Sequence, residues 1–207
     1  WLLAPPVPAA EYITGSGCSV SNVGYLMDLA TEYERRTGIK VFVRGGGSVV
    51  GIEDLRSGKV DFAAACRQRS AGDPEDITFV QVAWDALVFI VHPSNPIDAI
   101  SLNTVRSIYA GRVTDWRQIR GSKAPIKVFL SRAKQGLSGV EASTTTLVLN
   151  NREPVKSPTI LPMASTGIVE QMVETTPEGF ATTGYTSARK RNVKMLRVNG
   201  VHPTSKN

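Results

Sequence analysis

Residues 43–67 read VRGGGSVVGIEDLRSGKVDFAAACR, and their pattern gives the clearest indication of the fold class. It starts at the end of an apolar strand, KVFVR at 40–44, and passes through three glycines into a helical segment that Gly58 closes. VDFAAAC at 60–66 is then a second strand, and such a nearly continuous apolar run is typical of a strand buried on both faces of a parallel sheet. Strand, glycine turn, helix and strand in succession predict an α/β protein.

The same alternation continues on both sides of this stretch. YITG at 12–15 predicts a strand, and a helix is expected over 22–37 with Ser21 as its N-cap. Further strands are expected at 79–84 (FVQVAW), 86–91 (ALVFIV), 126–132, 179–186 and 193–198, with helices after the caps Ser101 and Ser165.

Three glycine-rich turns stand where a strand ends and a helix begins. They read TGSGCS at 14–19, GGGSVVG at 45–51 and QGLSG at 135–139. Glycine lets the backbone approach a ligand closely, and the start of a helix offers unpaired N–H groups and the positive end of its dipole. In a parallel sheet such turns lie at one edge, so together they predict an anion-binding crevice.

Charge and composition narrow the class of protein. The 207 residues carry 24 Lys and Arg against 18 Asp and Glu, a net charge of +6 that points to an anionic partner. With 42% apolar and 20% charged residues the chain is an ordinary globular one, neither disordered nor collagen-like. The longest apolar run, at 86–91, is too short to cross a bilayer.

Several function classes lack their sequence signals. The two cysteines form no CxxC or Cys/His cluster, so neither a zinc site nor another metal is expected, and no cofactor is expected either. The sequence shows neither a Ser–His–Asp order nor paired carboxylates in a glycine-rich context, so these signals of an enzyme are missing. The positive charge could also indicate a nucleic-acid binder. The basic residues are scattered, however, and no recognition helix is present, which argues against this function.

The order of several segments resembles one known family. The GSG turn before a helix, the stretch 43–67, WDALVFIVHPSNP at 84–96, LNTVRSIYAGRVTDWRQI at 102–119 and the closing segments at 164–187 and 198–204 are similar to the phosphate-type periplasmic substrate-binding proteins of ABC importers. The resemblance covers nearly the whole chain after residue 10.

The resemblance implies the type II periplasmic-binding-protein fold, two doubly wound α/β lobes joined by two hinge strands with the ligand cleft between them. Lobe one is then 10–85 plus 186–207, and lobe two 86–185. Such a protein is not an enzyme. It is a monomer in the periplasm or on the cell surface that delivers a small inorganic oxyanion, phosphate first among them, to a membrane permease or sensor. The alternative reading is a ligand-sensing domain of a larger signalling protein.

The resemblance also implies a set of ligand contacts. These are Gly15, Ser16, Gly17, Cys18, Gly47, Ser48, Val49 and Arg67 in lobe one, and Arg132, Ser138 and Gly139 in lobe two. Val140 stands where the family has Thr, and the spacing from Arg132 to Ser138 is about two residues longer than in the family. A protonated oxyanion needs an acceptor, for which Asp85 and Glu141 are the candidates, and the choice of anion stays open.

The two cysteines, Cys18 and Cys66, each follow a strand. With the doubly wound strand order 2-1-3, these two strands are neighbours about 4.8 Å apart. That separation suits a disulfide, and an exported protein meets oxidising conditions. A Cys18–Cys66 disulfide at the floor of the cleft is therefore expected, with two reduced thiols as the alternative. The start of the chain, WLLAPPVPAA, fits either a mature end left by a signal peptide or a trimmed chain.

Overall fold

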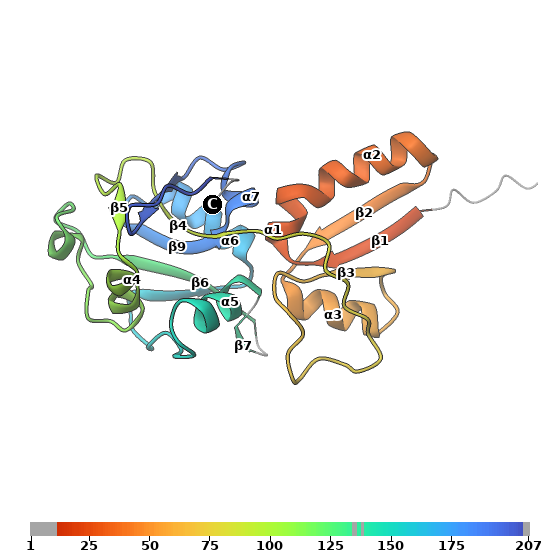
Figure 1. Cartoon of the computed structure of the whole chain (residues 1–207), viewed down its shortest axis with the longest axis horizontal. Helices are drawn as coiled ribbons and strands as arrows, with labels where there is room; N and C mark the ends of the chain where they lie inside the picture. Colours follow the sequence, from red (N-terminus) through yellow and green to blue (C-terminus); the bar gives the residue numbers. More distant parts are fainter. Residues whose placement is uncertain (1–11, 134–135, 138, 205–207) are drawn as a thin grey trace, which may run out of the picture.

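The computed structural model describes residues 12–133, 136–137 and 139–204, which fold into two lobes lying side by side (Figure 1). Lobe one contains the first three strands and their helices, and lobe two contains the elements from β4 onward. The chain passes from one lobe to the other in the segment that leads into β4 (Leu87–Val91). The expected two-lobed α/β fold is confirmed.

Lobe one is built on a parallel sheet with the strand order β2-β1-β3. Its strands are β1 (Tyr12–Gly17), β2 (Lys40–Gly45) and β3 (Phe62–Ala64). Parallel neighbours need long crossovers, which helices supply here. The turns that follow the three strands consequently open at the same edge of the sheet. The order 2-1-3 expected from the sequence is confirmed.

A continuous helical segment follows β1. Its parts are α1 (Ser19–Ser21), the π-helical turn η1 (Asn22–Leu26) and α2 (Met27–Thr37). Gly38, with φ 74°, ends α2 in the left-handed conformation that glycine adopts freely. The helix starts at Ser19, ahead of the expected cap Ser21, which already has helical dihedral angles and makes no capping hydrogen bond.

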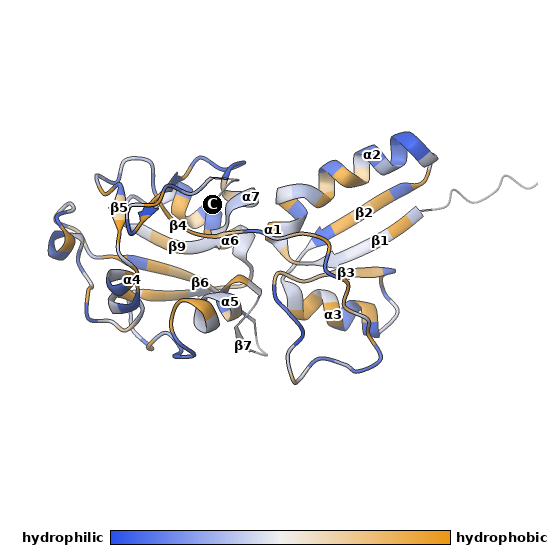
Figure 2. Ribbon diagram, in the orientation of Figure 1, coloured by the Kyte–Doolittle hydropathy of each residue, from blue (hydrophilic) through white to orange (hydrophobic). Residues whose placement is uncertain are grey.

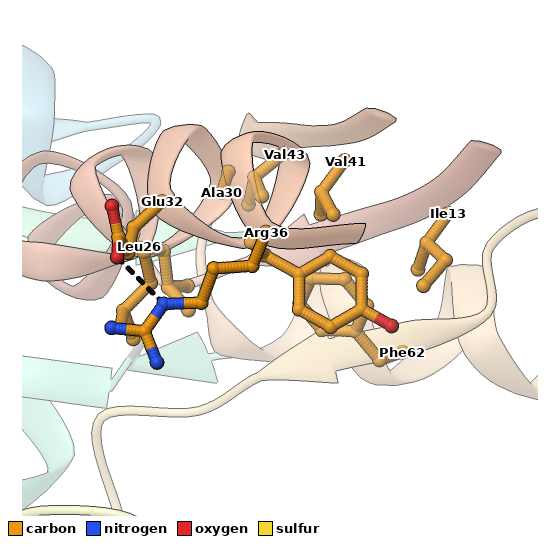
Figure 3. A pocket seen from close by; sticks show the side chains of 10 residues that line it. Ile13, Leu26, Ala30, Glu32, Arg36, Val41, Val43 and Phe62 are labelled. Carbon is orange, nitrogen blue, oxygen red and sulfur yellow. Dashed lines mark hydrogen bonds and ion pairs between the residues drawn. The ribbon is translucent and has the colours of Figure 1, made fainter. Parts of the chain in front are cut away.

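α3 (Ser48–Arg56) packs against β1 and β3, on the opposite side of the sheet from α2 (Figure 1). Under α2 the sheet keeps an open apolar groove of about 530 Å³ (Figure 3). Ile13 and Phe62 line it from the strands, and Leu29 and Tyr33 line it from the helix side. Since Leu29 and Tyr33 keep 56% and 42% exposure, lobe one has a thin apolar core on this face.

Lobe two is built on a mixed six-stranded sheet with the main order β10-β4-β9-β6-β7, and β8 pairs with β6. Besides β4, its strands are β6 (Lys127–Ala133), β7 (Gly136–Leu137), β8 (Ile160–Met163), β9 (Gly179–Gly184) and β10 (Lys194–Met195). A small separate sheet pairs β5 (Ala99–Ile100) with β11 (Arg197–Val198). Because β6, β8 and β9 run parallel, their carboxyl ends point the same way.

The helices of lobe two are α4 (Leu102–Tyr109), the 3₁₀ turn η2 (Trp116–Ile119), α5 (Gly139–Leu147), α6 (Thr166–Thr175) and α7 (Tyr185–Ala188). Ser101 Oγ and Ser165 Oγ accept backbone N–H groups in the first turns of α4 and α6, which confirms both predicted caps. Such a cap stabilises a helix by about 1 kcal/mol. Within the described residues, no helix combines the length and apolar character needed to span a membrane.

The large apolar side chains are buried on both sides of the lobe-two sheet, and hydrophobic residues recur along its strands (Figure 2). In one cluster Phe89, Tyr109 and Trp116 surround Phe180, with ring centroids 6.0–6.2 Å apart. The other cluster packs α6 against the sheet. Each fully buried large side chain contributes about 1.5–3 kcal/mol, so lobe two is the better-packed scaffold.

The end of the chain lies with lobe two, which corrects the expected assignment of 186–207 to lobe one. β10 pairs antiparallel with β4, and β11 pairs parallel with β5. The strand expected at 193–198 is therefore two short strands that complete two sheets of lobe two. Before that, α7 packs against η1 of lobe one, so the chain reaches the boundary at 185–188 and turns back.

The strand expected at 79–84 is absent from the structure. In this stretch Val80, Val82 and Trp84 are 75%, 73% and 83% exposed. No strand pairs with this stretch among the described residues. An alternating pattern yields a strand only where a neighbouring strand can take its hydrogen bonds. Among the described strands of lobe one, β3 pairs with β1 alone.

Candidate functional site

Four helices begin at the boundary between the lobes. α1 starts at Ser19 and α3 at Ser48 in lobe one, while α5 starts at Gly139 and α6 at Thr166 in lobe two. The first N–H groups of a helix have no partner within the helix, and the helix dipole is positive at that end. Helix starts gathered at one boundary suit the binding of an anion.

Two glycines of lobe two allow the lobes to approach closely. A Cβ on Gly139 would lie 2.6 Å from Ser48 Oγ and 3.2 Å from Cys66 Cβ. A Cβ on Gly167, in the first turn of α6, would lie 3.3 Å from Ser19 Cβ. The lobes are thus closed on one another, and the structure brings the predicted residues Ser48 and Gly139 together.

Backbone hydrogen bonds hold the turn between β1 and α1. The N–H groups of Gly46 and Gly47 both donate to Gly17 O at 2.8 Å, and Cys18 N–H donates to Ala64 O at 2.8 Å. Gly17 has φ 141°, and a Cβ there would clash with Ala64 O, so glycine is required. The predicted residues Gly17, Cys18 and Gly47 therefore lie together at this sheet edge.

Gly15 and Ser16 face the interior of lobe one. Ser16 Oγ donates to Asp54 Oδ2 at 2.8 Å, and this hydrogen bond is the first cause of the lowered pKa of Asp54. Arg44 donates to the same carboxylate oxygen. Gly15 lies in β1, where the lack of a side chain makes room for the Phe62 ring. The Ser16 hydroxyl is consequently used within lobe one.

Ser19 is the serine that the structure places at the boundary, and the sequence-based set omitted it. It is the first residue of α1, is 7% exposed, and has its side chain between two glycines of opposite lobes. A Cβ on Gly45 or Gly167 would lie 3.1 or 3.6 Å from Ser19 Oγ. The available signal was the second serine of GSGCS at 15–19, because it directly follows the glycine turn.

Cys66 connects the two lobes through its backbone. Its N–H donates to Ser48 Oγ at 3.1 Å, and its C=O accepts from Ser143 Oγ of α5 at 3.2 Å. Its sulfur is bonded to Cys18, with a Cα–Cα distance of 5.8 Å, so the predicted disulfide is confirmed. Val49 follows Ser48 as the second residue of α3 and is half-buried.

Arg67 directs its guanidinium into lobe one. Nη1 and Nη2 each donate to one oxygen of Asp73 at 2.6 Å, and Nη1 also donates to Gln68 O. The two side chains are 10% and 7% exposed, and the Arg67 hydrogen bonds are the first cause that lowers the pKa of Asp73 to about 2. The charged contact expected of Arg67 is thus engaged by a buried carboxylate.

Arg132 follows the buried residues of β6, and its carboxylate partner is more exposed than that of Arg67. Its Nη2 donates to Glu153 Oε2 at 3.0 Å, with the two side chains 36% and 65% exposed. Ser138 lies outside the described residues, so its predicted contact stays a prediction.

Val140 takes an apolar place between the lobes. It is 2% exposed and packs with Cys18 and Val20 of lobe one. The position where the resembling family has Thr therefore supplies hydrophobic contact in this chain. Burial of one such side chain contributes about 1.5–3 kcal/mol to the closed arrangement.

The two candidate acceptors lie in different places. Asp85 links the crossing between the lobes to α7, because its Oδ2 accepts from Thr186 Oγ1 at 2.7 Å and its Oδ1 from Thr186 N–H at 3.2 Å. Glu141, in the first turn of α5, is 1% exposed and accepts Ser131 N–H at 3.0 Å. Burial raises the pKa of Glu141 to about 8.

Two α/β lobes closed over a set of helix starts define a class of bilobal ligand-binding proteins. The family model described as the PBP superfamily domain matches residues 4–204, and the chain belongs to this superfamily.

Two similar proteins carry the name phosphate-binding protein PstS. The phosphate-binding protein PstS of Bacillus subtilis (strain 168) is 22% identical over 202 residues, which cover 96% of this chain and 65% of the relative. The phosphate-binding protein PstS of Borreliella burgdorferi is 28% identical over 204 residues, covering 94% and 72%. The chain thus spans about two thirds of the length of the first relative.

A solved structure shares the fold. The structure titled as a putative phosphate ABC transporter substrate-binding protein with bound phosphate from Clostridium perfringens superposes with a TM-score of 0.79. It is 22% identical, and the match covers 95% of this chain and 79% of that one.

Proposed function

We propose that this chain is an extracytoplasmic solute-binding protein that captures a small inorganic oxyanion, most of all phosphate, for import by an ABC transporter. The observation that carries the proposal is the opposition of helix starts, where Ser48 of α3 meets Gly139 of α5 across the lobe boundary. The names of the two curated relatives and the phosphate in the Clostridium perfringens structure support the choice of anion.

The proposed donors are mainly neutral. Backbone N–H groups at the helix starts and the hydroxyls of Ser19 and Ser48 surround the boundary. A hydrogen bond to a charged group contributes about 1.5–3 kcal/mol. Closure of the lobes removes water, which strengthens each of these interactions. A tetrahedral anion, with oxygens in every direction, fits donors that come from both lobes.

Arg132 is the proposed cation of the site. Its partner Glu153 is 65% exposed, so exchanging that carboxylate for a ligand oxygen costs little, as with other exposed ion pairs. Arg67 differs, because its partner Asp73 is 7% exposed and would be left buried without its cation. Of the two arginines that the family resemblance implies, Arg132 can therefore exchange its partner for a ligand oxygen, whereas Arg67 stays paired with Asp73.

Capture and release without catalysis is the proposed role. A membrane permease is the proposed partner, or a sensor if the same chain serves a signalling protein. The proposed location is the periplasm or the cell surface, and the proposed state is a monomer. The net charge of +6 supports attraction of anions toward the boundary.

The test is a thermal shift series with phosphate, sulfate, molybdate and arsenate at fixed ionic strength, with chloride as the control. A ligand at about 100 times its Kd adds about 2.7 kcal/mol of apparent stability. We expect phosphate to raise the melting temperature most. If no oxyanion raises it above the chloride control, the proposal fails.

A further inference from the structure

A carboxyl group is buried beneath the start of α5. Glu141 is the acidic residue of the first turn of this helix and is 1% exposed. Its Oε1 accepts Ser131 N–H at 3.0 Å, and Ser131 directly precedes Arg132 at the end of β6. One side chain therefore ties the first turn of α5 to the end of the neighbouring strand.

The polar surroundings of this carboxyl are incomplete. Ser131 is fully buried, and its Oγ has no hydrogen-bond partner among the described residues. A buried polar atom without a partner costs free energy, so this region carries a polar group that the described side chains do not satisfy. Glu141 is in the same first turn of α5 as Gly139, the lobe-two residue that meets Ser48.

Among the described residues, the titratable groups that interact with Glu141 are Tyr109 of α4 and Arg132 of β6. Tyr109 shares a hydrogen bond with Thr182, and Arg132 is paired with Glu153. Burial raises the pKa of Glu141 to about 8, while the Ser131 N–H and the charge of Arg132 act in the opposite direction. At neutral pH the carboxyl is therefore largely uncharged.

An ionised Glu141 would stand next to the donors that the anion needs. Gly139 and Val140 form the lobe-two wall of the boundary, and Glu141 follows them directly. A negative charge there offsets the positive end of the α5 dipole, which would otherwise attract the ligand, and it repels a bound anion. The same charge attracts Arg132, and so competes with the ligand for the available arginine.

We propose that Glu141 is a positioning residue for the anion site: as a neutral carboxyl it holds the start of α5 against β6, and its ionisation weakens anion binding. The inference rests on the proposed function. It makes the chain an anion binder whose affinity falls at alkaline pH, and it assigns that fall to one buried side chain.

The test compares the Kd of inorganic phosphate for the wild type and for Glu141→Gln between about pH 6.5 and about pH 9.5. The ratio of the two Kd values cancels the titration of phosphate itself. We expect a ratio near one at the acid end and a rise of about tenfold at the alkaline end. The matched control is Glu178→Gln, which removes a carboxylate beside Lys127 at the opposite end of the lobe-two sheet.

Two results decide between the possibilities. If the wild type binds phosphate and the ratio stays constant with pH, the role of Glu141 is refuted while the proposed function stands. If the wild type binds no oxyanion at any pH, the proposed function itself fails.

Should Glu141→Gln not fold, sulfate supplies the second measurement on the wild type, because sulfate does not titrate in this range. Stabilisation by sulfate should decline across about pH 8. A level profile, or no decline before the lysines titrate, overturns the inference.

Discussion

Gly139, the first residue of α5, lies so close to Ser48 of the opposite lobe that a Cβ on Gly139 would come within 2.6 Å of Ser48 Oγ. Both residues are buried. The closed arrangement of the lobes at this point depends on the missing side chain at 139, since any other residue would push against Ser48 or the Cys66 Cβ.

Gly139→Ala should therefore weaken anion binding. The added methyl opposes closure by roughly 1–3 kcal/mol, which corresponds to a rise in Kd of about five- to 150-fold. Calorimetric titration with phosphate measures this effect. Gly72→Ala is the control, because a Cβ there meets nothing within 4 Å. Equal affinities for the two variants would show that the lobes do not close as seen here.

The serines should separate into two groups. Ser19→Ala and Ser48→Ala remove hydroxyls at the boundary, and each should raise the Kd for phosphate by about tenfold, equivalent to about 1.4 kcal/mol. Ser16→Ala should leave the Kd within about twofold and lower the free energy of unfolding by about 1–3 kcal/mol, because its hydroxyl serves buried Asp54. Titration calorimetry and urea unfolding of the same three variants test the contrast, and loss of affinity in Ser16→Ala alone would contradict it.

The disulfide should stabilise the chain by closing a long loop. Cys18 and Cys66 are 48 residues apart, and loop-closure entropy gives about 4 kcal/mol for such a separation. The Cys18→Ala, Cys66→Ala double variant should unfold at correspondingly lower urea concentration. Counting thiols in the unfolded, unreduced wild type gives an independent check, since two free thiols per chain would rule out the bond.

The two predicted arginines should behave differently. Arg132→Gln should raise the Kd for phosphate by about tenfold, because it removes the cation whose partner is exposed. Arg67→Gln should lower the free energy of unfolding more than the affinity, since it leaves Asp73 buried without its partner. Calorimetry and urea unfolding on both variants test this, and the reverse pattern would place Arg67 in the site.

The pair of Arg67 and Asp73 also predicts an acid-dependent loss of stability. The pKa of Asp73 is lowered from 3.8 to about 2 in the folded chain, so the folded state binds fewer protons than the unfolded state between these values. Its stabilisation is complete above about pH 4 and disappears as the pH falls toward 2. Asp73→Asn should remove this part of the acid profile, as measured by urea unfolding at several pH values.

Much of the fold could be predicted because it rests on local patterns. β2, before the glycine turn at 45–47, and β3, after the helix that follows this turn, both pair with β1 in the expected order. The caps Ser101 and Ser165 act on helices that begin directly after them. The disulfide follows from the strand order, because β1 and β3 lie side by side and each is followed by a cysteine.

Other features depend on contacts that no local pattern specifies. FVQVAW at 79–84 alternates like a strand, yet no strand pairs with it among the described residues. The strands at 194–198 join lobe two because β4 and β5 offer free edges there. The start of the helix at Ser19 follows from the turn hydrogen bond that Cys18 C=O accepts from Asn22 N–H.

Residue spacing along the chain was enough to predict the α/β class and to place glycine turns ending in serines at helix starts, whereas the two lobes were implied by the resemblance to a known family. Which side chains lie at the boundary was settled only by the folded chain. Ser16 forms a hydrogen bond with Asp54, 38 residues away, and Ser19 is the serine that lies at the boundary. Arg67 is paired with the buried Asp73, whereas Arg132 is paired with an exposed carboxylate. Side-chain hydrogen bonds and burial are set by neighbours in space, and those neighbours exist only after the chain has folded.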